Sequence, residues 1–169
     1  MDTVKINTIK LFYGVTSAQS SSTLYSDTNQ TSVYNNVNWY IKGNNNFNTI
    51  NQSVTRGYPA YTNSTALLPT QVSKAQGVII NFNNSISNAD SIMVIIQDHT
   101  NASFEVSKTV VGSSTGITFS SNDLSGLTTG GNPAQIYIAS KNYSNLSANT
   151  KVYVFIMYSS LSGYVTINP

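Results

Sequence analysis

Residues 33–41, VYNNVNWYI, decide the fold class because their apolar side chains recur with a period of two. Val37, Trp39 and Ile41 fall on one face of an extended segment, while the positions between them are Asn or Tyr. The pattern predicts a strand with an apolar inner face, and it places Trp39 in the core.

Other segments of the chain also predict strands. Residues 104–110 alternate in the same way, and residues 92–96 and 152–158 are continuous apolar runs, which predict central strands covered on both faces. Residues 4–13 predict a strand whose inward phase slips, as a β-bulge at residues 7 and 8 would cause. The remaining candidates are residues 52–55, 78–82, 117–120, 135–140 and 163–167.

Loops and turns separate the predicted strands. Three polar stretches, residues 17–30, 43–51 and 63–76, predict long loops. The glycine-rich residues 112–116 predict a chain reversal, and residues 161–163 are expected to close the last hairpin.

The composition agrees with an all-β chain. The sequence holds 22 Asn, 25 Ser and 19 Thr, which favour turns and caps over helix interiors. Only residues 121–127 resemble a short helical turn, with Ser120 or Ser121 as its N-cap. We therefore expect one antiparallel β-sandwich domain over residues 1–169, with about eight to ten strands and either Ig-like or jelly-roll topology.

The charge pattern excludes two classes of partner. Charged residues make up only 8% of the chain and the formal net charge is +2, with the eight basic residues scattered singly. Because no basic stripe faces a phosphate backbone or an anionic bilayer, we expect neither nucleic-acid binding nor membrane insertion. If Met1 is the native start, the segment after it lacks the apolar run of a secretion signal. The absence of cysteine is compatible with either redox compartment.

The residues available for catalysis are few, with one His and six carboxylates. Asp98 and Glu105 are the only two carboxylates that a hairpin could bring together, and a turn Asp beside a solvated strand Glu is the favoured interpretation. Asp98 and His99 point to opposite faces of an extended segment, although in a turn they could form a weak metal or pH-sensitive site.

A second sequence motif associated with catalysis lies in surroundings that do not suit it. Gly112, Ser114 and Gly116 match the form G-x-S-x-G, but the segment after them is strand-like and the single histidine precedes Ser114. The sequence also lacks phosphate-binding and calcium-loop motifs. We expect a protein without enzymatic activity, metal or cofactor.

Aromatic side chains are the best indication of a contact surface. Tyr34, Tyr40, Tyr58 and Tyr61 are the candidate contact residues, since tyrosines can stack on sugar rings while neighbouring Asn and Thr bond to hydroxyls. Trp39 shares the apolar face of its strand, so we assign it to the core.

The chain resembles bacteriophage virion accessory proteins, namely capsid decoration proteins, head fibres and tail adhesins. The resemblance lies in the scarcity of charge, the Asn, Ser and Thr-rich loops, and the tyrosine-bearing strands over residues 33–41 and 152–158. It implies a non-enzymatic structural component of the virion that folds in the host cytoplasm. It also implies contacts in a homo-oligomer, or with other virion proteins, and in some cases with a host glycan. The alternative is an extracellular carbohydrate-binding β-sandwich module.

Overall fold

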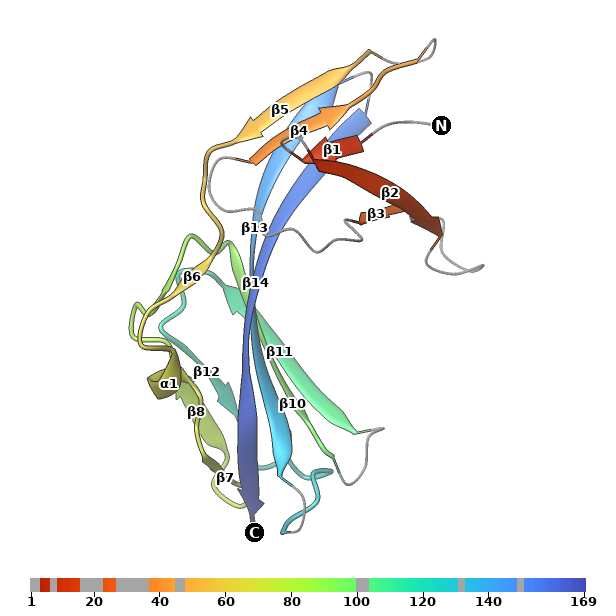
Figure 1. Cartoon of the computed structure of the whole chain (residues 1–169). Helices are drawn as coiled ribbons and strands as arrows, with labels where there is room; N and C mark the ends of the chain where they lie inside the picture. The colour runs from red at the N-terminus through yellow and green to blue at the C-terminus, as the bar shows by residue number, and fades with distance from the viewer. Residues whose placement is uncertain are drawn as a thin grey trace. The chain divides into compact units, whose positions relative to one another are not determined.

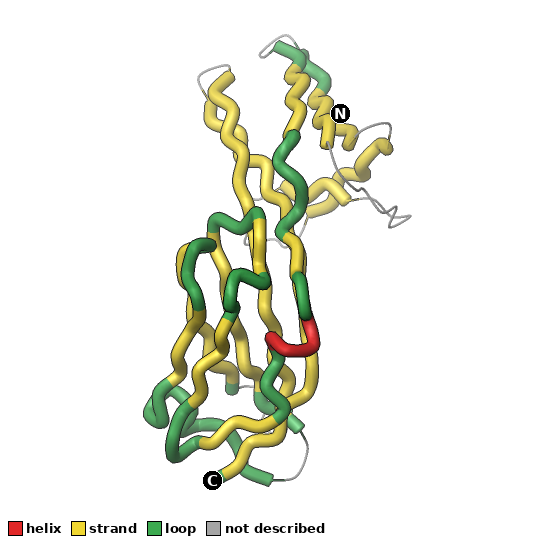
Figure 2. The backbone as a smooth tube through the Cα atoms, turned by 90° about the vertical axis from the view of Figure 1, so that its left-hand side faces the viewer, coloured by secondary structure: helices red, strands yellow, loops and turns green. Residues whose placement is uncertain are grey.

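The computed structural model shows the all-β fold that the sequence predicts (Figure 1). It describes residues 4–6, 9–15, 23–26, 37–44, 48–99, 104–130, 133–148 and 151–169. Within these ranges there are fourteen strands and one helix of four residues, which is the single red segment in Figure 2. The strand count exceeds the eight to ten expected because several short strands lie inside predicted loops.

The chain divides into two compact units, each described separately below. The first comprises residues 1–57 and 144–155, and the second comprises residues 58–143 and 156–169. Two long strands, β13 (Ala134–Ala148) and β14 (Lys151–Asn168), contribute residues to both units. The sequence gives no sign of this division, and the treatment of residues 1–169 as a single domain stays a prediction.

The first unit contains a five-stranded antiparallel sheet in the order β3-β2-β1-β4-β5. Its members are β1 (Val4–Ile6), β2 (Ile9–Val15), β3 (Thr23–Ser26), β4 (Val37–Ile41) and β5 (Ile50–Val54). In β4 the predicted alternation holds for Val37, which is buried, and Asn38, which is exposed, whereas Trp39, Tyr40 and Ile41 are all half-buried.

Two expectations for the first unit are corrected. The single strand predicted over residues 4–13 is instead two strands, β1 and β2, which pair antiparallel with Ile6 opposite Ile9. The β-bulge predicted at residues 7 and 8 lies outside the described residues. The predicted loop over residues 17–30 contains β3, and the one over residues 43–51 ends inside β5. Polar composition concealed these short strands.

The second unit is built on a five-stranded sheet in the order β11-β10-β13-β14-β7. In Figure 1 the labels β10, β11 and β14 mark these long strands. Besides β13 and β14, this sheet contains β10 (Ser91–Gln97), β11 (Glu105–Val111) and β7 (Gln71–Ser73). Two further sheets have two strands each: β8 (Val78–Asn81) pairs with β12 (Gly116–Phe119), and β6 (Ala60–Tyr61) pairs with β9 (Ile86–Ser87).

The main sheet of the second unit is mixed. β14 pairs with β7 in parallel, whereas the pairs of β10 with β11 and with β13 are antiparallel. The strict antiparallel expectation is therefore wrong for one pair. It failed because residues 63–76, expected to be a loop, contain both the helix α1 (Ser64–Leu67) and β7.

β14 continues through residues 161–163, where the sequence predicted a turn. Gly163 lies close to a neighbouring side chain there: a Cβ at this position would lie 2.9 Å from Leu68 Cδ1, and Leu68 would have to shift. The glycine therefore marks a close approach of a side chain to a strand, and no hairpin closes at this point.

One hydrophobic core fills the second unit. It joins the buried rows of β10, β13 and β14 to side chains of β8, β12 and the segment that follows β12. The side chains Ile92, Val94, Ile96, Ile136 and Ile138 are 0% exposed. These five residues show that the even-numbered positions of β10 and β13 face the core.

Candidate contact surface

The main sheet of the second unit has an outer face opposite the core. We define it as the odd-numbered residues of β10, β11 and β13 together with the even-numbered residues of β14 that lie in this unit. Met93 and Ile95 on β10 are partly exposed, although their even-numbered neighbours are fully buried. The apolar run over residues 92–96 is thus central in the sheet but fully covered on one face only.

β14 shows the same one-sidedness more strongly. Phe155 and Met157 are buried, whereas Ile156 is 50% exposed and Tyr158 is 52% exposed. The expectation that residues 152–158 are covered on both faces is therefore wrong. In the share of β14 that belongs to the first unit, Val152 and Val154 are also exposed.

The outer face is almost free of charge. Among the described residues at its positions, the only Lys, Arg, Asp or Glu side chains are Lys141 and Glu105. Lys141 lies opposite Ser91 at one end of β10, and Glu105 lies opposite Gln97 at the other end. The face consequently has no net charge, because it carries one positive side chain near one end and one negative side chain near the other.

Near the Glu105 end, polar side chains form a row across three strands. Gln97 of β10 lies opposite both Glu105 of β11 and Gln135 of β13. Beside this row, His99 Nε2–H donates to Gln135 Oε1 at 3.2 Å. The His99 ring also meets the ring of Tyr164 on β14 edge-on, with centroids 5.8 Å apart. Tyr164 itself is 64% exposed.

Tyr61, one of the four tyrosines proposed from the sequence as contact residues, does not lie on the outer face. Tyr61 is half-buried, and its hydroxyl lies within 3.0 Å of Ile138 O, Ser140 Oγ and Ser159 O. Burial raises the pKa of this phenol, while hydrogen bonds from Ser140 act in the opposite direction. Tyr61 is thus a structural residue that holds β6 against β13 and β14.

Two of the other three candidates belong to different units, and the third is not described. Tyr40 is half-buried on β4 with Lys5 Nζ 5.9 Å from its ring centroid, so it belongs to the first unit. Tyr58 belongs to the second unit, and burial raises its pKa. Tyr34 lies outside the described residues.

Trp39 occupies the inner phase of β4, as predicted. Its ring packs at a tilt against Phe155, with centroids 5.3 Å apart, and the side chain is partly buried. Its Nε1 atom is buried without a hydrogen-bond partner among the described residues. Trp39 is therefore a packing residue of the first unit.

The two carboxylates considered for catalysis lie on opposite faces of the sheet. Asp98 is buried, and its Oδ2 accepts a hydrogen bond from the Thr128 backbone N–H at 2.6 Å. Glu105 is exposed on the outer face. They cannot flank one bond. His99 is also exposed, so it diverges from Asp98 as an extended segment requires.

The G-x-S-x-G match joins two strands, as expected. Ser114 N–H donates to Val111 O in the turn between β11 and β12. A Cβ on Gly112 would clash with Ala89 O, and one on Gly116 would lie 2.8 Å from Ile80 O. The glycines therefore allow backbone segments to approach each other, and the match has no catalytic context.

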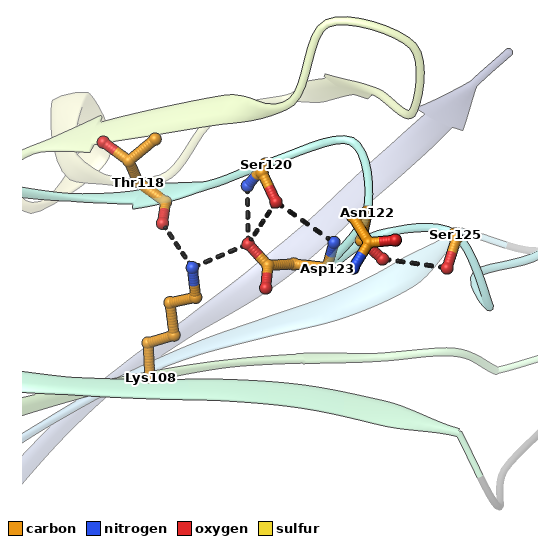
Figure 3. Close-up of polar contacts among 6 residues, drawn as sticks. All are labelled: Lys108, Thr118, Ser120, Asn122, Asp123 and Ser125. Carbon is orange, nitrogen blue, oxygen red and sulfur yellow. Dashed lines mark hydrogen bonds and ion pairs between the residues drawn. The ribbon is translucent and has the colours of Figure 1, made fainter.

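Lys108, Ser120 and Asp123 form a compact ionic cluster at the end of β12 (Figure 3). Asp123 Oδ2 lies 2.6 Å from Lys108 Nζ and accepts hydrogen bonds from the backbone N–H and Oγ–H of Ser120 at 2.7 Å. Asp123 N–H is 3.3 Å from Ser120 Oγ, which completes a capping box. The predicted cap at Ser120 is confirmed, although residues 121–127 form turns instead of a regular helix.

The same contacts set the acidity of Asp123. The hydrogen bond from Lys108, followed by those from Ser120, lowers its pKa from 3.8 to about 2. A carboxylate held in its charged form by a lysine and a cap stabilises a turn and is a poor proton carrier near neutral pH. We assign this cluster a structural role.

Within the described ranges, no three His, Cys, Asp or Glu side chains gather as metal ligands would. No helix in the same ranges has the length and hydropathy that crossing a bilayer would need. Comparison with protein-family models, with curated proteins and with solved structures finds no match.

Sequence reasoning missed the outer face of β14 and the group formed by Tyr164, His99 and Gln135. The two tyrosines that matter there, Tyr158 and Tyr164, have the same parity in the sequence as Ile156. Residues of the same parity share one face of a strand, so the sequence could have placed these three side chains together. The predicted turn at residues 161–163 divided them between two segments instead.

Proposed function

We propose that this protein is a non-enzymatic assembly protein, a structural or accessory component of a bacteriophage virion, whose copies associate through the outer face of β14 in the second unit. The observation that supports this proposal is the exposure of Ile156 and Tyr158, two large side chains that alternate with buried core residues. Exposed apolar groups that are clustered and uncharged are a feature of protein contact surfaces.

The chemistry of the surface suits a protein partner. Tyrosine is enriched at interaction hot spots, where its ring supplies contact area and its hydroxyl finds a partner. Burying an isoleucine side chain completely contributes about 1.5–3 kcal/mol, and Ile156, which is 50% exposed, has about half of that to gain. In a two-fold contact each copy contributes one Ile156, so two such side chains are buried. The contribution to association is therefore doubled.

A second copy of the chain is the partner that the charge pattern favours. The outer face has no net charge, so two copies meet without repulsion between like charges. Lys141 and Glu105 lie near opposite ends of this face. The proposed contact at Ile156 and Tyr158 itself carries no charged side chain and leaves the Glu105 end of the face uncovered. An uncharged patch of this kind can pack against its own copy across a two-fold axis.

The test of assembly compares two isoleucines of similar exposure. Ile156→Ser removes the proposed contact on β14, and Ile79→Ser changes a residue on β8 that is 62% exposed. Light scattering on a sizing column should find an oligomer for the unmodified chain. Ile156→Ser should weaken association by roughly ten- to hundredfold, because two half-exposed side chains no longer become buried. Ile79→Ser should leave it unchanged.

Two results would contradict the assembly proposal. One is a monomer at every concentration for the unmodified chain, and the other is an equal loss of association in both variants. Membership of the virion is tested separately by mass spectrometry of purified particles of the phage that encodes this chain. Absence of the protein from those particles would remove the virion assignment while leaving self-association intact.

A further inference from the structure

We infer that the Glu105 end of the outer face is a binding site for a neutral oligosaccharide, formed by Gln97, Glu105, Gln135 and Tyr164. This site is separate from the proposed assembly contact. Tyr158 and Tyr164 are six residues apart on one strand, which corresponds to about 20 Å. The two residues between them on the same face are Ser160 and Ser162.

The arrangement of the polar row is the first argument. Glu105, Gln97 and Gln135 lie side by side on three neighbouring strands, and β14 with Tyr164 is the next strand of the sheet. Four strands at normal spacing span about 14 Å. An extended surface of this width accommodates more than one sugar ring of a chain.

The hydrogen-bonding chemistry is the second argument. Each glutamine amide offers both an acceptor oxygen and an NH2 donor, and the carboxylate of Glu105 offers acceptors only. Sugar hydroxyls both donate and accept, so they can bond with amides and carboxylates in pairs. The Gln135 amide also lies 3.2 Å from His99 Nε2, so the imidazole adds a further polar group beside the row.

The aromatic ring is the third argument. Tyr164 is 64% exposed, and its ring is held edge-on by His99, with centroids 5.8 Å apart. A ring supported in this way keeps its orientation without being covered. The apolar C–H groups on one face of a pyranose pack on such a ring, and little side-chain freedom is lost on binding.

The charge at this end selects among hydroxylated ligands. The only charged side chain of the row is the carboxylate of Glu105, and Lys141 lies six positions along β10, opposite Ser91. An anionic sugar, a phosphate or a nucleic acid would meet a like charge and no cation. A neutral oligosaccharide meets neither penalty.

The experiment measures binding by isothermal titration with three soluble probes: maltohexaose, cellohexaose and chitohexaose. The unmodified chain should bind at least one of them. Tyr164→Ala should weaken that binding about tenfold, because it removes the stacking ring. Tyr158→Ala is the matched control, since it changes an exposed tyrosine on the same strand and face. It should leave sugar binding unchanged.

A second pair of variants keeps the test decisive if Tyr164→Ala fails to fold. Gln97→Ala and Gln135→Ala remove the amides from partly exposed positions, and each should also weaken binding of the same probe. The inference is overturned if none of the three probes binds the unmodified chain. It is also overturned if Tyr158→Ala weakens binding as much as Tyr164→Ala does.

Light scattering on the same variants separates this inference from the proposed assembly. Tyr164→Ala should retain self-association while losing sugar binding, and Ile156→Ser should show the reverse. If the unmodified chain is monomeric but binds a probe, only the assembly proposal falls. If it assembles and binds no probe, only the sugar site falls.

Discussion

The two faces of the main sheet in the second unit both carry isoleucine, but they differ sharply in how much of it is exposed. The inner face holds Ile92, Ile136 and Ile138, all 0% exposed, and the outer face holds Ile156 at 50% and Tyr158 at 52%. Isoleucine thus occurs on both faces of one sheet. On the inner face it stabilises the fold, whereas on the outer face it contributes little to folding and remains available for a partner.

The comparison teaches that an apolar side chain becomes a functional candidate when the fold leaves it uncovered. Phe155 and Met157 alternate with Ile156 and Tyr158 along β14, yet only the odd-numbered pair is buried. Large side chains at the even-numbered positions are therefore not explained by the core. We propose a contact with another molecule as the reason for them.

The largest expected effect separates the two faces by stability. Ile136→Ala removes a fully buried side chain, so we expect it to lower the free energy of unfolding by about 2–5 kcal/mol. Ile156→Ala removes a half-exposed one and should change the same quantity by about 0.5 kcal/mol or less. Urea denaturation of dilute protein, in which the proposed contact between copies is dissociated, measures both.

Similar losses for the two variants would break the comparison. A large loss for Ile156→Ala would mean that the outer face is covered within one copy of the chain. A small loss for Ile136→Ala would mean that the inner face is not a packed core. Far-UV circular dichroism serves as a control that each variant retains its strands.

A second, smaller effect compares tyrosine hydroxyls inside and outside the core. Tyr61→Phe removes a hydroxyl that bonds with groups of β13 and β14, and we expect a loss of about 1–2 kcal/mol. Tyr158→Phe removes a hydroxyl on the outer face and should be neutral within about 0.5 kcal/mol. The measurement is again the free energy of unfolding. Equal losses in the two variants would show that the interior position of Tyr61 does not matter.

The all-β class could be predicted from the sequence because it depends on local pattern. Alternation in β4 predicted both the strand and the inward phase of Trp39, and the polar composition excluded long helices. The division of residues 4–13 into two antiparallel strands could not be predicted, because a slip in the apolar phase alone does not distinguish an irregularity within one strand from the end of one strand and the start of another. The strand β7 was missed because three residues between polar neighbours carry too little pattern.

The contact surface could not be predicted because it depends on pairing between distant segments. Residues 152–158 form a continuous apolar run, in which nothing marks the even-numbered side chains as exposed. The contact between His99 and Tyr164 joins residues 65 positions apart, and it exists only because their strands belong to one sheet. Tyr61 was selected for its ring, but its role follows from carbonyl groups that the fold brings to it.

The inner face is not purely apolar, and this refines the comparison. Lys108 occupies an even-numbered position of β11 among the inward residues Val106 and Val110. It is tolerated because β11 is the edge strand of its sheet and Asp123 meets the ammonium group there. Charge on the inner face thus occurs where the edge gives it both solvent and a partner.

The smallest expected effect tests this edge by pH. Contacts with Lys108 and then with Ser120 lower the pKa of Asp123 from 3.8 to about 2, so the folded state favours the charged carboxylate more than the unfolded chain does. The resulting stabilisation is fully present above pH 3.8 and is lost as the pH falls to about 2. Asp123→Asn should therefore be less stable than the unmodified chain above this window, and the difference should shrink within it. Lys108→Gln, which removes the main cause of the shift, should reduce the same pH dependence. A difference in urea midpoint that stays constant across the window would show that Asp123 acts only as an uncharged turn residue.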